Sequence, residues 1–275
     1  MKSYLGAVSL LLVTTACFAL TGGETDRTRV LLEQKSPSRS QAAIQGATLA
    51  ATDTEGSSLT LQVRDVELDP KDTEGDVYLY TLYFYDAEQD SWENYCLPDA
   101  MGVAKAIPLH GQWDATGAYL DDPSLITFAC TSGVLAKCVR WGYKPWKNLK
   151  GESLRPYHQT CVRMARADYC GDGESHTRDG TVIDVYDLIG IQKPSGDAQM
   201  VFEAGWDEHG ATYLNHARWF ESVEEIARAC PGKFSYGQLH PEASFVPEQI
   251  VEKFPTTKLF NGSLLRVDGS SAGFF

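Results

Sequence analysis

The sequence lacks the short motifs by which many enzymes are recognised. It has no glycine-rich loop of the kind that cradles phosphate groups, and no two histidines stand at a zinc-motif spacing with a glutamate nearby. The histidines are instead scattered along the chain, at His110, His158, His176, His209, His216 and His240. The sequence therefore names no reaction, and we expect the protein to use no cofactor.

Basic residues are also scarce. The 24 lysines and arginines are outnumbered by 37 aspartates and glutamates, which gives a formal net charge of −13. Proteins that bind nucleic acid need a basic face, and so do proteins that adhere to anionic lipid by charge. We therefore expect no nucleic-acid partner and contact with a membrane only through a lipid anchor. A protein or a glycan remains as the expected ligand.

The apolar run at the start of the chain is short. Leu5–Ala16 follows the lone positive charge of Lys2 and falls well below the roughly 20 residues that a membrane-spanning helix needs. This pattern is typical of an export signal, which we place at residues 1–17. We therefore expect the protein in the cell envelope, either lipid-anchored in the outer membrane or periplasmic, or else secreted.

The end of this signal has two interpretations. Val13–Cys17 resembles the cleavage box of a bacterial lipoprotein, in which the cysteine, here Cys17, carries the lipid. Thr14 departs from that box, where a larger aliphatic residue is usual. The alternative is ordinary cleavage a few residues later, near Ala19 or Gly23. Both outcomes remove Cys17 from the cysteines that can pair.

The remaining six cysteines favour a disulfide framework, because their number is even and the chain has an export signal. Six cysteines allow fifteen pairings. Each bridge would stabilise the fold by about 2–4 kcal/mol, mainly by restricting the unfolded chain. We favour a bridge between strands, a bridge between two helices and a third bridge, namely Cys96–Cys130, Cys138–Cys161 and Cys170–Cys230.

One of these thiols could instead be a nucleophile. Cys161 is the best candidate, because His158 stands one helical turn earlier and a nucleophile needs a base and an orienting group. The alternative function is therefore an envelope hydrolase with a site near Cys161, His158 and Asp168, and His176 is a further candidate. If Cys161 were a free nucleophile, one of the other five cysteines would have no partner for a disulfide, which is unfavourable in an oxidising compartment. We therefore favour a protein that is not an enzyme.

Acidic residues gather shortly after Cys161, and oxygen ligands in a glycine-containing loop are what Ca²⁺ prefers. The candidates are Asp168, Asp172 and Asp179, but their spacing does not match that of a calcium-binding loop. Asp172 and Asp179 each precede a glycine and fit turns. We therefore expect no metal.

Asp168 differs from the other two carboxylates because it falls on the apolar side of a predicted helix. A buried carboxylate there needs a cationic partner. The chain offers three arginines for this role, Arg140, Arg163 and Arg166. We expect a structural ion pair.

The patterning predicts an α+β fold with a mostly antiparallel sheet and about three helices. Alternating, aromatic and β-branched runs predict strands at Leu59–Val63, Val77–Tyr85, Ser124–Cys130, Thr181–Tyr186 and Val201–Trp206. Cap and stop signals predict helices from Thr131 or Ser132 to Gly142, from Pro156 to about Ala167, and from the capping box Ser222–Glu225 to Pro231. We expect a flexible tether over 18–46, an α+β domain over 47–234 and a C-terminal extension over 235–275.

Local features sharpen this outline. Asp179–Gly180 predicts a hairpin turn. The strings Trp113–Ala118 and Trp206–Ala211 match one another and predict two similar hairpins, each with a tryptophan packed at its base. A group of aromatic residues could line a sugar or peptide groove but more often packs in a core, and it comprises Trp141, Tyr143, Trp146 and Tyr157.

Two strings carry a family resemblance. They are Lys-Cys-Val-Arg-Trp-Gly-Tyr-Lys-Pro-Trp over 137–146, and Cys-Val-Arg-Met-Ala-Arg-Ala-Asp-Tyr-Cys-Gly-Asp-Gly over 161–173. With them the chain resembles the ADYC-domain family, which takes its name from the tetrapeptide Ala167–Cys170, over about Ala47–Phe234. The resemblance implies an exported bacterial protein, often a lipoprotein, with no assigned activity. It supplies no catalytic residues.

Overall fold

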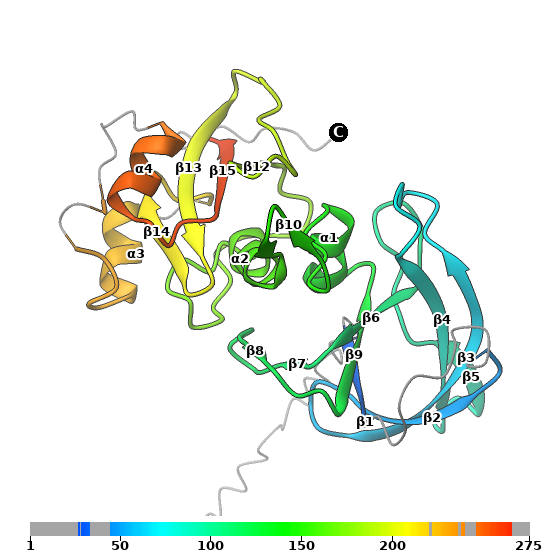
Figure 1. Cartoon of the computed structure of the whole chain (residues 1–275). Coiled ribbons are helices and arrows are strands. Elements are labelled where there is room, and N and C mark those ends of the chain that lie inside the picture. Colours follow the sequence, from blue (N-terminus) through cyan, green and yellow to red (C-terminus); the bar gives the residue numbers. More distant parts are fainter. Residues whose placement is uncertain are drawn as a thin grey trace, which may run out of the picture.

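The computed structural model describes residues 27, 29–33, 45–219, 222–235, 238–239 and 246–265. The predicted signal over 1–17 and the lipidation candidate Cys17 lie outside these ranges. No helix within them is long and apolar enough to cross a membrane. The described chain has an α+β architecture, in which two antiparallel sheets flank a pair of central helices (Figure 1).

The first sheet is a barrel. Its seven strands pair in the order β3-β2-β1-β9-β6-β4-β5, and β3 also pairs with β4, so that six strands close on themselves and β5 adds to β4. All these pairings are antiparallel. The strands are β1 (Arg29–Glu33), β2 (Thr48–Thr52), β3 (Ser58–Leu68), β4 (Tyr78–Asp86), β5 (Ser91–Asn94), β6 (Ala106–His110) and β9 (Leu125–Cys130).

The barrel interior follows from the alternation of side chains along each strand. Val30 pairs with Phe128, and Tyr80 pairs with Ala106, so these side chains share the inner face. The rings of Tyr80 and Phe128 meet edge to face at 5.2 Å between centroids. The predicted disulfide Cys96–Cys130 lies among the same buried residues and ties the loop after β5 to the end of β9.

The prediction of a tether over 18–46 is wrong for β1. Arg29–Glu33 lies between β2 and β9 in the middle of the sheet. Val30 and Leu32 are buried in the barrel interior. The sequence offered only a three-residue apolar run here, and the strand forms because of its pairing with β9, which is nearly a hundred residues away along the chain.

Two helices form the central layer (Figure 1). Helix α1 (Val134–Arg140) has Gly133 as its N-cap rather than the predicted Thr131 or Ser132. The Thr131 hydroxyl donates instead to the carbonyl oxygen of Val103, at 2.6 Å. Helix α2 (Arg155–Ala165) begins around Pro156 as predicted and ends two residues earlier than expected. The predicted disulfide Cys138–Cys161 joins the two helices.

The second sheet has the strand order β12-β15-β13-β14 and is antiparallel throughout. Its strands are β12 (Ile183–Asp187), β13 (Met200–Asp207), β14 (Gly210–Leu214) and β15 (Leu259–Leu264). The predicted C-terminal extension is wrong, because β15 lies between β12 and β13 and most of its residues are buried. The turn at Asp179–Gly180 forms, but it makes no hairpin because β12 pairs with β15.

Two further helices pack beside this sheet, α3 (Val223–Ala229) and α4 (Pro247–Lys253). The predicted capping box of α3 is present: the Ser222 hydroxyl accepts from the Glu225 backbone N–H, and the Glu225 carboxylate accepts from the Ser222 N–H. The disulfide Cys170–Cys230 joins the end of α3 to the loop after α2, as predicted. Helix α4 had not been predicted, and its start at Pro247 was the available signal.

The two similar strings form two hairpins, as predicted. Short strands β7 (Gln112–Trp113) and β8 (Tyr119–Leu120) make the first, and β13 and β14 make the second. Trp113 and Trp206 are both buried. One continuous apolar core runs from the outer face of β6 and β9 through α1 and α2 to β13 and β14, so the described chain packs as one unit.

Candidate functional site

The predicted hydrolase site does not assemble. Cys161 is bonded to Cys138 and has no free thiol. His158 is 1% exposed, and its Nε2 lies 3.0 Å from the carbonyl oxygen of Leu135. Burial lowers the pKa of His158 to about 4, so the ring is neutral at physiological pH. The buried His176 ring packs against Tyr169 instead, at 5.6 Å between centroids. The alternative function therefore loses its nucleophile.

The three carboxylates proposed for calcium do not converge. Asp172 accepts the backbone N–H of Glu174 in an exposed turn, and Asp179 lies in another turn. Asp168 is fully buried and forms an ion pair with Arg163, as expected of one of its three candidate partners. Its carboxylate also accepts the backbone N–H groups of Gly171 and Gly173, at 2.8 and 3.0 Å. Asp168 thus fixes the conformation of the loop after α2 through this ion pair and these two hydrogen bonds.

Each residue of the tetrapeptide Ala167–Cys170 has a structural role in the loop. Ala167 is buried with a left-handed φ of 51°, a conformation that residues other than glycine rarely adopt. Asp168 pairs with Arg163, and Cys170 forms the bridge to Cys230. The Tyr169 ring stacks on Trp206, with 5.1 Å between centroids. The tetrapeptide is therefore a junction between α2 and the second sheet.

Arg163 extends this junction to both hairpins. Its guanidinium donates to the carbonyl oxygens of Thr116, in the β7–β8 turn, and Glu208, in the β13–β14 turn. Gly171 and Gly173 press against the same two turns: a Cβ at Gly171 would lie 1.9 Å from the His209 carbonyl oxygen. The matching strings thus supply two equivalent turns that one ion pair holds on either side.

A buried polar network continues behind Tyr169. The Tyr169 hydroxyl donates to the Glu203 carboxylate at 2.9 Å, and Arg218 grips the same carboxylate with two nitrogens at 3.0 Å. Arg218 also donates to the last carbonyl groups of α2, those of Met164 and Ala165. Burial opposes ionisation of Glu203, but the Arg218 charge outweighs it and lowers the pKa of that carboxyl. Every charge in this network has a partner.

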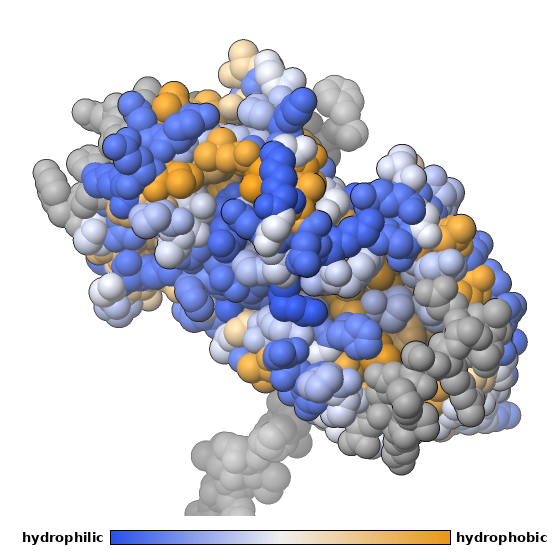
Figure 2. All heavy atoms as spheres, in the orientation of Figure 1, coloured by the Kyte–Doolittle hydropathy of each residue, from blue (hydrophilic) through white to orange (hydrophobic). Residues whose placement is uncertain are grey.

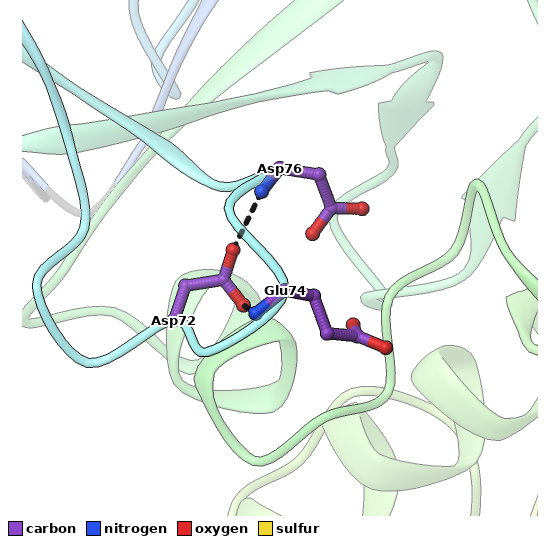
Figure 3. Close-up of side chains that lie close together, drawn as sticks. All are labelled: Asp72, Glu74 and Asp76. Carbon is purple, nitrogen blue, oxygen red and sulfur yellow. Dashed lines mark hydrogen bonds between the residues drawn. The ribbon is translucent and has the colours of Figure 1, made fainter.

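The cluster of carboxylates that could hold a metal lies elsewhere, in the loop between β3 and β4. Asp72, Glu74 and Asp76 place one oxygen each within 4.8 Å of one another (Figure 3). The Lys144 ammonium contacts all three carboxylates, at 2.5 to 2.6 Å. Its hydrogen bonds lower the pKa of Glu74 and, against the opposing effect of burial, that of Asp76. Lysine thus occupies the position that a cation would take.

Sequence reasoning missed this cluster, although its alternate acidic residues were a signal. Lys144 belongs to the first of the two family strings, over 137–146, which joins the two sheets. Its neighbour Tyr143 donates to Asp187 on β12 at 2.8 Å, while Trp146 donates through Nε1 to Asp76 at 2.9 Å. Of the aromatic group, Tyr143 and Tyr157 are core residues, as favoured, but Trp146 remains 41% exposed.

Trp146 is among the described residues that line a large cavity at one end of the barrel, which is called the open end below. The cavity has a volume of about 1400 Å³. Four side chains of the inner barrel face line it and are only partly buried, namely Leu49, Leu59, Tyr78 and Ile126. The buried rings of Tyr80 and Phe128 lie deeper in the barrel. Figure 2 shows apolar atoms in the recess between the barrel and the central helices.

No sequence motif marked this cavity, because its lining comes from several strands and from the loop around Trp146. Asp76, His110 and Arg155 supply polar groups at its lining.

The comparisons with known proteins concern the domain as a whole rather than the cavity. The family model for the ADYC domain matches residues 41–220, which is well over half of the chain. No curated protein and no solved structure matches. The chain belongs to the ADYC domain family.

Proposed function

We propose that this protein is a non-catalytic binding domain of the cell envelope and that the open end of the barrel is its ligand site. The observation that carries the proposal is the cavity of about 1400 Å³ lined by partly exposed apolar side chains. Ligand sites are typically concave and mostly apolar, with a few polar groups. This volume exceeds the roughly 300–1,000 Å³ of ordinary small-molecule sites.

The lining favours an apolar ligand over the glycan expected from the aromatic residues. Leu49, Leu59 and Ile126 point into the barrel and have no described neighbours that cover them completely. A ligand that covers apolar side chains removes their surface from water, which stabilises the complex by about 25 cal/mol for each Å² buried. Threonine, serine and tyrosine hydroxyls also line the cavity, but most of the lining side chains are aliphatic or aromatic.

Two features support a binding role rather than catalysis. The cysteine proposed as nucleophile is bridged, and its neighbour His158 is buried beneath α1. Asp76, the one carboxylate in the described lining, is engaged by Lys144 and Lys147. The envelope location remains part of the proposal: three disulfides and the N-terminal pattern support it, because disulfides persist in oxidising compartments.

The test is binding of a neutral apolar fluorophore, N-phenyl-1-naphthylamine, to the purified protein. We expect saturable binding that Leu59→Trp weakens at least about tenfold, since the larger ring projects into the cavity and takes space that a ligand packed against Leu59 needs. Val182→Trp is the matched control, because Val182 is 61% exposed and does not line the cavity.

Melting temperatures and circular dichroism of both variants establish that they are folded. Absence of saturable binding to the wild-type protein, or equal binding by the two folded variants, would contradict the proposal.

A further inference from the structure

Arg155 introduces a positive charge into a cavity whose lining is mostly apolar. It is the first residue of α2 and lines the cavity together with Trp146. Its guanidinium carbon lies 4.4 Å from the centroid of the Tyr119 ring. Two of the described lining residues carry a full charge, Asp76 and Arg155, and Asp76 is already paired with lysines. Arg155 is therefore the charge in the lining that a ligand can neutralise.

The guanidinium is incompletely satisfied. Its Nη1 nitrogen is buried and has no hydrogen-bond partner among the described residues. No described carboxylate lies within salt-bridge distance of Arg155, whereas Arg163 and Arg218 each have one. A buried polar group without a partner is unfavourable, and in a native protein it calls for an explanation such as a missing ligand.

The start of α2 adds to the positive potential at the same place. The helix has 11 residues, its N-cap Leu154 provides no side-chain cap, and its first turn contains no acidic residue. The dipole of a helix favours an anion near its N-terminus. The first N–H of α2, that of Arg155, already donates to the Ser153 hydroxyl at 3.3 Å, and Pro156 has none. The arginine and the helix dipole point to one ligand chemistry, since both favour negative charge beside the cavity.

We propose that the ligand is an anionic amphiphile, in which an acyl chain occupies the barrel and a carboxylate or phosphate head group binds Arg155. The proposal rests on the function proposed above and names its ligand class. The apolar side chains Leu49, Leu59 and Ile126 contact the chain, while Arg155 donates to the head group through its fork of N–H groups. The net charge of −13 repels anions at long range, so recognition depends on this local site.

The experiment compares three amphiphiles with the same chain below their micelle concentrations: oleate, oleoyl lysophosphatidate and the uncharged oleyl alcohol. Each is titrated against protein preloaded with N-phenyl-1-naphthylamine. We expect at least one anion to bind about tenfold or more tightly than the alcohol, because a charge-assisted hydrogen bond to arginine is among the strong ones. The better of the two anions identifies the head group.

Variants assign that preference to Arg155. Arg155→Gln should remove the preference and leave alcohol binding unchanged, and Arg155→Lys should retain part of it. Arg228→Gln is the matched control, because Arg228 is an exposed arginine of α3 that does not line the cavity. Folding of each variant is checked by its melting temperature.

The outcomes separate the two proposals. Equal affinity for the alcohol and both anions, or an anion preference that survives Arg155→Gln, would overturn this inference while leaving the apolar site in place. Failure of the fluorophore and of all three amphiphiles to bind would overturn both.

Discussion

The junction formed by Ala167–Cys170 and the open end of the barrel differ in whether their charged and apolar side chains find partners within the protein. At the junction, buried charges are matched: Asp168 pairs with Arg163, and Glu203 pairs with Arg218. At the open end, apolar side chains stay partly exposed, and Arg155 has no carboxylate partner among the described residues. The difference teaches that the family strings build the scaffold, whereas the proposed site lies where those strings contribute little.

The largest expected effect comes from breaking the junction. Asp168→Ala leaves Arg163 as an unpaired buried charge and frees the N–H groups of Gly171 and Gly173. We expect the free energy of unfolding to fall by about 3–5 kcal/mol, the usual range when one partner of a buried ion pair is removed. Urea unfolding of the purified variant measures it.

The control for this variant is Asp172→Ala, in the exposed turn of the same loop. It should change the free energy of unfolding by no more than about 0.5 kcal/mol. Equal losses for the two variants would show that the junction owes its stability to the loop as a whole rather than to the Asp168 pair.

An intermediate effect is expected from His158 as a function of pH. Its folded pKa of about 4 lies below the ordinary value of 6.5, so between these values the unfolded chain binds a proton that the folded protein does not. Stability from this group is present above pH 6.5 and is lost as the pH falls toward 4, by roughly 3 kcal/mol in total.

Variants isolate that contribution. His158→Gln should lack this part of the pH dependence, so its stability deficit relative to wild type should shrink between pH 7 and pH 4, as measured by denaturant unfolding at each pH. His110→Gln, at the open end of the barrel, is the control. A constant deficit for His158→Gln over this range would refute the assignment.

The smallest effect is expected from calcium. Because Lys144 already contacts Asp72, Glu74 and Asp76, adding Ca²⁺ to the chelated wild-type protein should shift its melting temperature by less than about 1 °C. Lys144→Gln leaves the three carboxylates without their central cation and should make the protein respond to Ca²⁺.

Lys147→Gln serves as the control, since it removes a more exposed lysine from the same cluster and leaves Lys144 in place. A clear calcium response of the wild-type protein would mean that the loop is a metal site after all.

Much of the fold could be predicted where short-range rules apply. Strand alternation located β3, β4, β9 and β13, and the capping box located the start of α3. The three disulfide pairs were also predicted correctly, and four of the six cysteines fall on predicted elements, namely Cys130, Cys138, Cys161 and Cys230. The expected ion pair of Asp168 formed with Arg163.

The errors share a physical cause, which is pairing between distant parts of the chain. Strand β1 and strand β15 carry few local signals, and each becomes a strand because of neighbours far away in sequence. The cavity was missed for the same reason, since Leu49, Ile126 and Trp146 meet only after the barrel closes. The proposed site could not be found from any one segment.

The most direct test of the central claim is a crystal structure of the protein with oleate. The account predicts an acyl chain inside the barrel between Leu59 and Ile126, with its carboxylate within hydrogen-bond distance of Arg155. An acyl chain bound elsewhere on the molecule, with the barrel cavity free of ligand, would contradict it.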